Sequence, residues 1–189
     1  MANTHPHDAG ALVQQILSCA SAGCDLFRVT VPDIESSKTL ALARAQSPIP
    51  LVADIHFDYK LALEAIAAGA DKVRINPGNI GGEDRVKAVA DACRLRNIPI
   101  RIGVNGGSLE KEILKKYGHP TAEAMRDSAL YHASLLEKFD FEDIIISIKS
   151  SDVRTMIAAN RLLHKMREYP LHIGVTETGP VRMGLMKSA

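Results

Sequence analysis

The sequence lacks the features that mark several classes of protein. Its 23 Lys and Arg residues nearly balance 22 Asp and Glu, and the formal net charge of +1 argues against a polybasic nucleic-acid arm or an acidic tail. No apolar run approaches the roughly 20 residues that span a bilayer. The N-terminal MANTHPHDAG has no basic region followed by an apolar stretch. We therefore expect no nucleic-acid partner, no membrane span and no secretory signal.

Cysteine is scarce as well. Cys19, Cys24 and Cys93 make an odd number and lack the spacing of metal ligands, which favours a reducing compartment over a disulfide framework. All three fall in helical patterns that face the predicted sheet, where small buried thiols are common. The chain is therefore expected to be cytoplasmic and to provide no metal ligands.

The sequence does contain a regular alternation of β-branched runs with amphipathic stretches rich in Ala and Leu. Strands that alternate with helices predict right-handed βαβ units and a parallel sheet. The predicted strands are residues 26–31, 51–56, 72–76, 98–105, 144–149 and 171–176. The predicted helices are residues 8–22, 34–46, 59–68, 83–96, 121–139 and 153–168, with a short one at 108–117. Gly23 and Gly69 follow helical runs as C-terminal caps.

The length bears on how complete this α/β fold is. A (β/α)8 TIM barrel typically needs about 250 residues, and this chain has 189. Since the pattern predicts about six of the eight β/α units, we expect an incomplete TIM barrel without its first and last strands. Residues 1–189 are expected to form a single, truncated substrate-binding domain.

Polar side chains recur on one face near the end of each predicted strand. Both faces of a barrel strand are buried, one against helices and one inside the barrel. Burying an unpaired charge costs several kcal/mol, so such side chains must meet a ligand or one another. The set comprises Arg28, Thr30, Asp54, His56, Arg74, Asn76, Arg101, Asn105, Ser147, Lys149, His172, Thr176 and Glu177. We expect these residues to form a ligand site at the C-terminal ends of the strands, where barrel enzymes build their active sites.

The charges of this set predict an anionic ligand. Arg28, Arg74, Arg101 and Lys149 supply four cations, and Arg and Lys are the side chains that bind phosphate oxygens. The glycine-rich turns 77–82 and 105–108 leave backbone N–H groups free to approach an anion. The negative charge of a phosphate or diphosphate would balance the positive charge of these side chains.

The strand-end motifs resemble the 4-hydroxy-3-methylbut-2-enyl diphosphate synthase family in its short bacterial form. The similar stretches cover nearly the whole chain in family order: MANT, RVTVPD, PLVADIHFDYKLAL, KVRINPGNIG, IPIRIGVNGGSLEKEILKKYG, SIKSSDV and PLHIGVTETG with the terminal MKSA. The resemblance implies a TIM barrel followed by a small domain that holds a [4Fe–4S] cluster. Because that domain is expected to lie outside residues 1–189, we expect this chain alone to bind no cluster and to be inactive.

The resemblance also implies a reaction. The family opens and dehydroxylates the ring of 2-C-methyl-D-erythritol 2,4-cyclodiphosphate in the methylerythritol phosphate route to isoprenoids, using two electrons from ferredoxin or flavodoxin, and its members are homodimers. Glu177 would lie beside the reacting carbon and relay a proton. For His172, a ligand contact and core packing both stay open. The diphosphate would be held by Arg28, Arg74, Asn76, Arg101, Asn105 and Lys149, with Asp54, His56 and Thr176 also lining the pocket.

Two other classes of function stay open. One is a non-redox TIM-barrel transferase that binds a phosphate. The other is an aldolase in which Lys149 forms a Schiff base, since nearby arginines would lower the pKa of its amine.

Several residues are expected to have no functional role. The run 110–116 is interpreted as a solvated helix face, and Met183 and Met186 as part of a mobile loop. The remaining histidines lack convergent partners and are expected at the surface: His5, His7, His119, His132 and His164.

Overall fold

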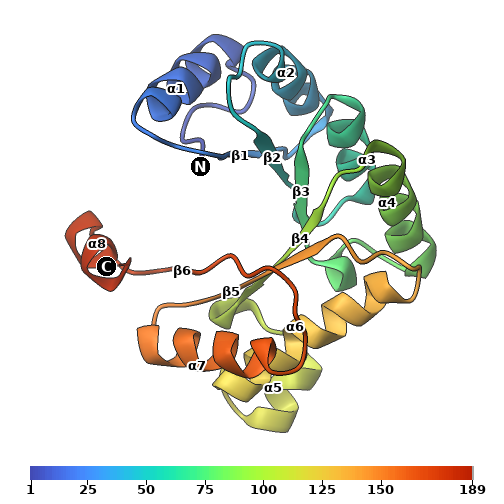
Figure 1. The fold of residues 1–189 in the computed structure, drawn as a ribbon, viewed down its shortest axis with the longest axis vertical. Coiled ribbons are helices and arrows are strands. Elements are labelled where there is room, and N and C mark those ends of the chain that lie inside the picture. Colours follow the sequence, from blue (N-terminus) through green and yellow to red (C-terminus); the bar gives the residue numbers. More distant parts are fainter. Residues whose placement is uncertain (189) are drawn as a thin grey trace.

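The computed structural model describes residues 1–188 of the chain. Six parallel strands form one curled sheet in chain order, β1-β2-β3-β4-β5-β6, which traces an arc in Figure 1. The strands are β1 (Phe27–Thr30), β2 (Leu51–Asp54), β3 (Lys72–Ile75), β4 (Ile100–Asn105), β5 (Ile144–Ser150) and β6 (Gly174–Val175). This curled half-barrel agrees with the expected incomplete TIM barrel.

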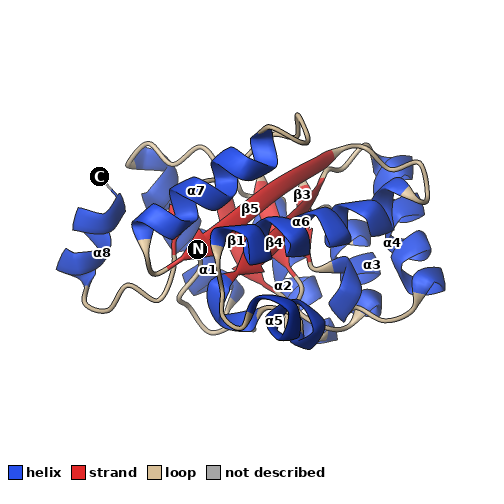
Figure 2. Cartoon of the chain, turned by 90° about the horizontal axis from the view of Figure 1, so that it is seen from below, coloured by secondary structure: helices blue, strands red, loops and turns tan. Residues whose placement is uncertain are grey.

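The helices line the outer, convex side of the arc, while α8 lies apart beyond β6 (Figures 1 and 2). They are α1 (Ala9–Ser21), α2 (Ile34–Arg44), α3 (Tyr59–Ala67), α4 (Glu83–Arg96), α5 (Lys111–Tyr117), α6 (Ala122–Glu137), α7 (Val153–His164) and α8 (Val181–Ser188). Two 3-10 turns, Pro77–Asn79 and Gly106–Ser108, follow β3 and β4. Within residues 1–188, every helix is too short or too polar to cross a membrane.

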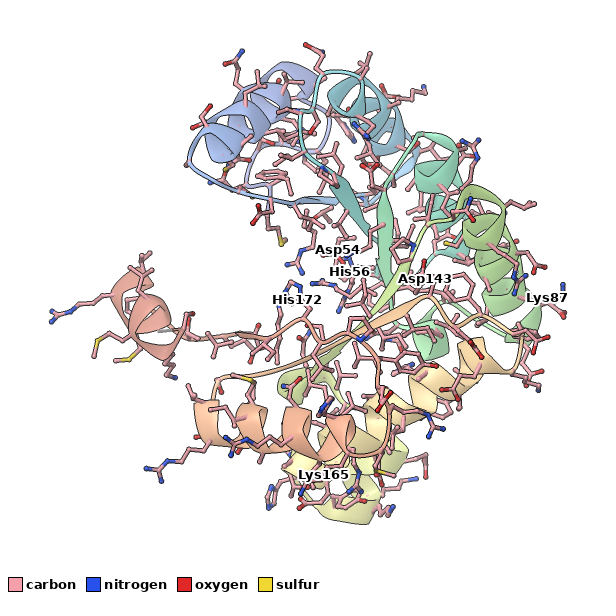
Figure 3. All side chains as sticks on the ribbon, viewed as in Figure 1. Asp54, His56, Lys87, Asp143, Lys165 and His172 are labelled. Atoms are coloured by element: carbon pink, nitrogen blue, oxygen red, sulfur yellow. The ribbon has the colours of Figure 1, made fainter. Side chains whose placement is uncertain are left out.

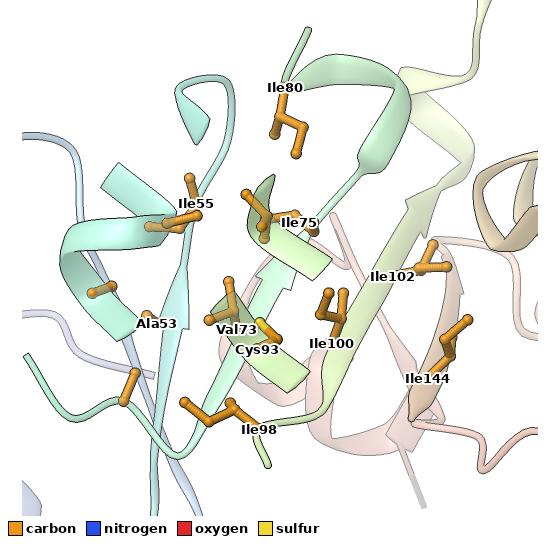
Figure 4. Close-up of a cluster of buried hydrophobic side chains, with 14 of the residues drawn as sticks. Ala53, Ile55, Val73, Ile75, Ile80, Cys93, Ile98, Ile100, Ile102 and Ile144 are labelled. Atoms are coloured by element: carbon orange, nitrogen blue, oxygen red, sulfur yellow. The ribbon is translucent and has the colours of Figure 1, made fainter. Parts of the chain in front are cut away.

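The hydrophobic core lies between the convex face of the sheet and these helices. Alternate residues of each strand point to opposite faces, so Ile100 and Ile102 of β4 and Ile144 of β5 are fully buried beneath the helices. The close-up in Figure 4 shows them beside Val73 and the buried thiol of Cys93 on α4. The intervening residues of the same strands are thereby directed to the concave face.

Strand register places the polar residues of neighbouring strands at one level. Thr30 pairs with Asp54, Asp54 with Arg74, and Arg74 with Arg101. Further along, Asn105 of β4 pairs with Lys149 of β5. Strands β1 to β4 therefore share one polar layer of the half-barrel, and β4 and β5 form a second one further along.

Most predicted elements are confirmed, and the helix ends have local causes. Residues 83–96 form α4 as predicted, and Gly23 and Gly69 have φ values of 90° and 93°, as glycine caps require. The predicted helix at 108–117 is shorter, because Gly106–Ser108 forms a separate 3-10 turn and α5 begins at Lys111.

The C-terminal predictions were less accurate. α7 ends at His164 rather than at residue 168, and β6 forms only Gly174–Val175, with an isolated bridge from Leu171 to Ile146. No strand among residues 1–188 flanks the outer edge of β6, so the pairing that would extend it is missing there. Met183 and Met186 lie in α8 rather than in a loop.

Candidate functional site

A cavity of about 310 Å³ opens on the concave face, where β2 to β5 end. Figure 3 shows Asp54 and His56 directed toward this hollow, whereas Lys87 and Lys165 lie on the outer side of the arc. Ten of the thirteen predicted strand-end residues line the cavity: Arg28, Asp54, His56, Arg74, Asn76, Arg101, Asn105, Ser147, Lys149 and Thr176. Alternation along the strands therefore brings most of the predicted set together.

Asp54 is the one carboxylate that lines the cavity within residues 1–188, and two arginines share it. Arg74 Nη1 lies 3.2 Å from Asp54 Oδ1, and Arg28 Nε lies 3.6 Å from Oδ2. With Arg101 and Lys149 also on the wall, four cations and one carboxylate give a formal charge of +3 when Lys149 is protonated. The site is therefore suited to an anion.

Gly103 of β4 fixes the position of Arg74. Arg74 Nη2 donates a hydrogen bond to the Gly103 carbonyl oxygen (3.0 Å), and the Gly103 N–H donates to Asn76 Oδ1 (3.0 Å). A Cβ at residue 103 would lie 2.4 Å from Arg74 Nε, far inside van der Waals contact. The guanidinium group thus occupies the space that any side chain at this position would need.

Arg101 is the more deeply buried of the two cavity cations, Arg101 and Lys149, that have no ion-pair partner within residues 1–188. It is 4% exposed, and its buried Nε has no hydrogen-bond partner among the described residues. No ion pair is formed by this guanidinium group within residues 1–188, and its pKa is lowered to about 10 by burial and by the neighbouring Arg28 and Arg74. An unpaired buried charge of this kind favours an anionic ligand.

Burial and nearby positive charges also lower the pKa values of two neighbouring bases, Lys149 and His172. Burial, followed by the charges of Arg101, Arg28 and Arg74, lowers the pKa of Lys149 to about 8. Burial and the charges of Arg101 and Lys149 lower the pKa of His172 to about 4. At neutral pH His172 therefore adds no positive charge.

Three predicted residues do not line this cavity: Thr30, His172 and Glu177. His172 lines a second cavity, at the end of the half-barrel where the strands begin, together with Cys24 and Lys72. Glu177 is exposed, with a left-handed backbone (φ 52°), and its carboxylate lies over Gly107, where an added Cβ would be 3.0 Å from Oε1. Because Ser108 of that turn lines the first cavity, Glu177 lies close to its wall.

The cavity also includes residues that the sequence did not single out. Phe57 follows His56, and Asn79 and Ser108 belong to the glycine-rich turns. Alternation did not reveal these three, because no periodicity marks which residues beyond the end of a strand point inward.

Two expectations about individual residues were wrong. His132 is fully buried rather than at the surface, because α6 packs it against the turn that follows β3. Cys24 lies after the end of α1 rather than within a helix, and both Cys19 and Cys24 are only partly buried.

A [4Fe–4S] cluster is held by Cys thiolates, and the described cysteines do not fit one. Within residues 1–188, no group of three or more His, Cys, Asp and Glu side chains is arranged to hold a metal ion. Burial raises the pKa of the Cys93 thiol to about 12, which opposes its ionisation. No chemical step through a cluster follows from these residues.

A family model described as the GcpE TIM-barrel domain matches residues 1–189, the whole chain. The chain belongs to this family. The predicted barrel class and the predicted family are therefore confirmed.

Curated relatives of high identity have names that agree with this assignment. A protein of Exiguobacterium sibiricum is 54% identical over 189 residues, and one of Maridesulfovibrio salexigens is 56% identical. Both are 4-hydroxy-3-methylbut-2-en-1-yl diphosphate synthases (flavodoxin). The match covers 100% of this chain but 51% and 53% of those relatives, so the chain spans about half of their length.

Solved structures of low identity share the fold. Type I 3-dehydroquinate dehydratase from Clostridium difficile has a TM-score of 0.66 at 14% identity, covering 95% of this chain and 74% of that one. Dihydropteroate synthase from Yersinia pestis has a TM-score of 0.62 at 13% identity, covering 94% and 72%. At such identities the likeness shows the barrel architecture alone.

Gly103→Ala is expected to weaken the binding of inorganic pyrophosphate about tenfold or more. The new methyl group displaces the Arg74 guanidinium and breaks its bonds to Gly103 and Asp54, and hydrogen bonds to charged groups contribute about 1.5–3 kcal/mol. Calorimetric titration measures the affinity. Gly82→Ala is the matched control, since its Cβ would meet nothing within 4 Å. Equal affinity in both variants would contradict the role of Gly103.

The affinity for pyrophosphate is expected to depend on the protonation of Lys149. Because the pKa of this amine is lowered to about 8, its positive charge is present below pH 8 and is lost as the pH rises toward 9.5. Lys149→Arg keeps the charge throughout. The ratio of wild-type to variant affinity should therefore fall between pH 7 and 9.5, and comparison at each pH cancels the ionisation of the probe. A constant ratio would show that the pH dependence of the affinity does not come from Lys149.

Proposed function

We propose that this chain is the substrate-binding barrel of a 4-hydroxy-3-methylbut-2-en-1-yl diphosphate synthase. The substrate would be 2-C-methyl-D-erythritol 2,4-cyclodiphosphate, whose ring opens at a C–O bond and which loses one hydroxyl as water on taking up two electrons and a proton. Support comes from the family assignment, from the names of the relatives and from the cationic cavity. The chain itself is proposed to supply the binding of the diphosphate.

Arg101 is the observation on which the binding proposal depends. A guanidinium group that is 4% exposed and unpaired among the described residues is costly unless an anion occupies the cavity. A cyclic diphosphate offers oxygen acceptors for Arg101, Arg28 and Lys149 while Arg74 stays paired with Asp54. Desolvation inside the half-barrel strengthens these charge-assisted bonds.

Side-chain amides would complete the cradle. Asn76 already accepts the Gly103 N–H through Oδ1, which leaves its amide NH2 to donate to a phosphate oxygen. Asn105 and Thr176 lie further along the same wall, and His56 lines its exposed rim. These neutral groups would orient the ligand, whereas the cations supply most of the attraction.

Glu177 is proposed as the group that relays a proton during turnover. Its carboxylate lies over the turn Gly106–Ser108 rather than among the cations, so it is free of the ion pairs that hold Asp54. A carboxyl group at the wall could protonate the departing hydroxyl of the substrate. Its backbone conformation, uncommon for a residue other than glycine, is of the kind found at functional sites.

The proposed partners follow the relatives. Flavodoxin is named for them, and we propose flavodoxin or ferredoxin as the electron donor, with a homodimer as the assembly. The cluster that such a reduction uses would be held outside residues 1–188. We also propose the cytoplasm as the location, because Cys19, Cys24 and Cys93 carry free thiols, as is usual in a reducing compartment.

Substitution of Arg101 is expected to weaken ligand binding, whereas substitution of Glu177 is expected to lower turnover without weakening binding. Arg101→Ala should lower the affinity for the cyclic diphosphate at least tenfold, because one charge-assisted contact is lost. Glu177→Gln should leave that affinity within about twofold and lower the turnover of an intact synthase that contains this barrel, since an amide relays no proton. Calorimetry measures the binding and product formation measures the turnover.

Lys87→Ala is the control for the loss of a positive charge, because Lys87 pairs with Asp91 on the outer face of α4. The variant should bind as the unchanged chain does. Unchanged affinity in Arg101→Ala would refute the proposed cavity, and unchanged turnover in Glu177→Gln would refute the proton relay.

The lowered pKa of Lys149 also suits a Schiff-base aldolase, the second candidate. A neutral amine at pH 8 attacks a carbonyl carbon, and borohydride would then trap the resulting imine as a stable adduct. We expect no adduct on Lys149 after treatment with dihydroxyacetone phosphate and borohydride, as read by mass spectrometry of the peptide. A covalent adduct there would favour the aldolase over the synthase.

A further inference from the structure

His132 on α6 is a buried histidine outside the cavity. Its side chain is fully enclosed (0% exposed), and it lies between the turn Pro77–Asn79 after β3 and Glu110, which precedes α5. The Gly78 N–H lies 3.1 Å from His132 Nδ1, and His132 Nε2 lies 2.5 Å from Glu110 Oε1. One side chain thus joins two turns that follow neighbouring strands.

These contacts fix the protonation of the imidazole. Because the Gly78 N–H donates to Nδ1, that nitrogen is unprotonated, and the neutral ring carries its hydrogen on Nε2. Nε2–H then donates to Glu110. Burial is the largest single influence on the Glu110 carboxyl and raises its pKa, but the lowering influences, chief among them the hydrogen bond from His132, together outweigh it, so the pKa lies below its ordinary value. A chain of two hydrogen bonds, here called the His132 relay, thus runs from the backbone N–H of Gly78 through the neutral ring of His132 to the carboxylate of Glu110.

Both joined turns provide walls of the cavity. Gly78 lies between Asn76 and Asn79, which line it, and Glu110 follows Ser108, which also lines it. A Cβ at residue 78 would lie 2.9 Å from His132 Cε1, so the turn rests directly on the ring. The N–H of Gly78, expected from sequence to be free for an anion, is instead used to hold the turn from outside.

We infer that His132 is a positioning residue which, with Glu110, holds the turns after β3 and β4 at the spacing that a diphosphate ligand requires. This inference rests on the proposed function for the identity of the ligand. No contact between His132 and the ligand is involved: the ring acts through Gly78 on Asn76 and Asn79, and through Glu110 on Ser108.

Three substitutions test the two hydrogen bonds of the His132 relay separately. His132→Asn places an amide oxygen where Nδ1 was and keeps the acceptor for Gly78. His132→Gln places an amide NH2 near the position of Nε2 and keeps the donor to Glu110. His132→Leu removes both. His164→Leu, at an exposed position on α7, is the control for loss of an imidazole.

Pyrophosphate affinity by calorimetry and amide hydrogen exchange at Gly78 are the two measurements. His132→Leu is expected to bind about tenfold more weakly, and His132→Asn and His132→Gln to fall between it and the unchanged chain. Exchange at Gly78 should accelerate in the Leu and Gln variants and stay slow in the Asn variant. A purely structural role in α6 would not divide the variants in this way.

The outcomes separate the two proposals. If the unchanged chain does not bind pyrophosphate, the proposed function fails, and the role of His132 in binding fails with it. If the chain binds and the folded variants bind equally well, only the positioning role is refuted. If His132→Leu does not fold, His132→Asn and His132→Gln decide, and equal exchange at Gly78 in both would overturn the relay.

Discussion

Mutual repulsion among the cations of the concave face is the constraint on which the rest of the structure depends. Arg28, Arg74, Arg101 and Lys149 surround one cavity whose wall contains a single carboxylate within residues 1–188. Burial and this repulsion together lower the pKa of the Arg101 guanidinium to about 10. Such a site lowers the stability of the unliganded fold, and that stability is regained when an anion binds.

The convex face offsets that cost with the same strands. In β4, Ile100 and Ile102 are fully buried under helices while Arg101, between them, faces the cavity. Each of the strands β1 to β5 therefore contributes apolar burial on one side, at about 25 cal/mol per Å², and a charged residue on the other. A shift of register by one residue would exchange the two faces, so the core and the site stabilise or fail together.

Much of the fold and of the candidate site was predictable from the sequence, because strand geometry determines which residues share a face. Side-chain alternation follows from strand geometry alone, and it brought ten of the thirteen predicted strand-end residues to one cavity. The register that aligns Asp54, Arg74 and Arg101 was not predictable, because it depends on pairing between strands. His132 was misjudged because its partners, Gly78 and Glu110, are 54 and 22 residues away in sequence, and no local pattern marks them.

The position of Glu177 separates the proposed proton relay from the proposed anion-binding residues within the half-barrel. The cations lie on β1 to β5, whose parallel pairing fixes them, whereas Glu177 follows β6, only two residues long. Its carboxylate is placed by the absence of a side chain at Gly107, a residue of the turn after β4. That turn is followed by Glu110, the carboxylate bound by His132. If the proposed roles hold, the spacing of the turns affects both the proposed cradle for the anion and the approach of Glu177, and a change at His132 would alter turnover of the intact synthase as well as affinity.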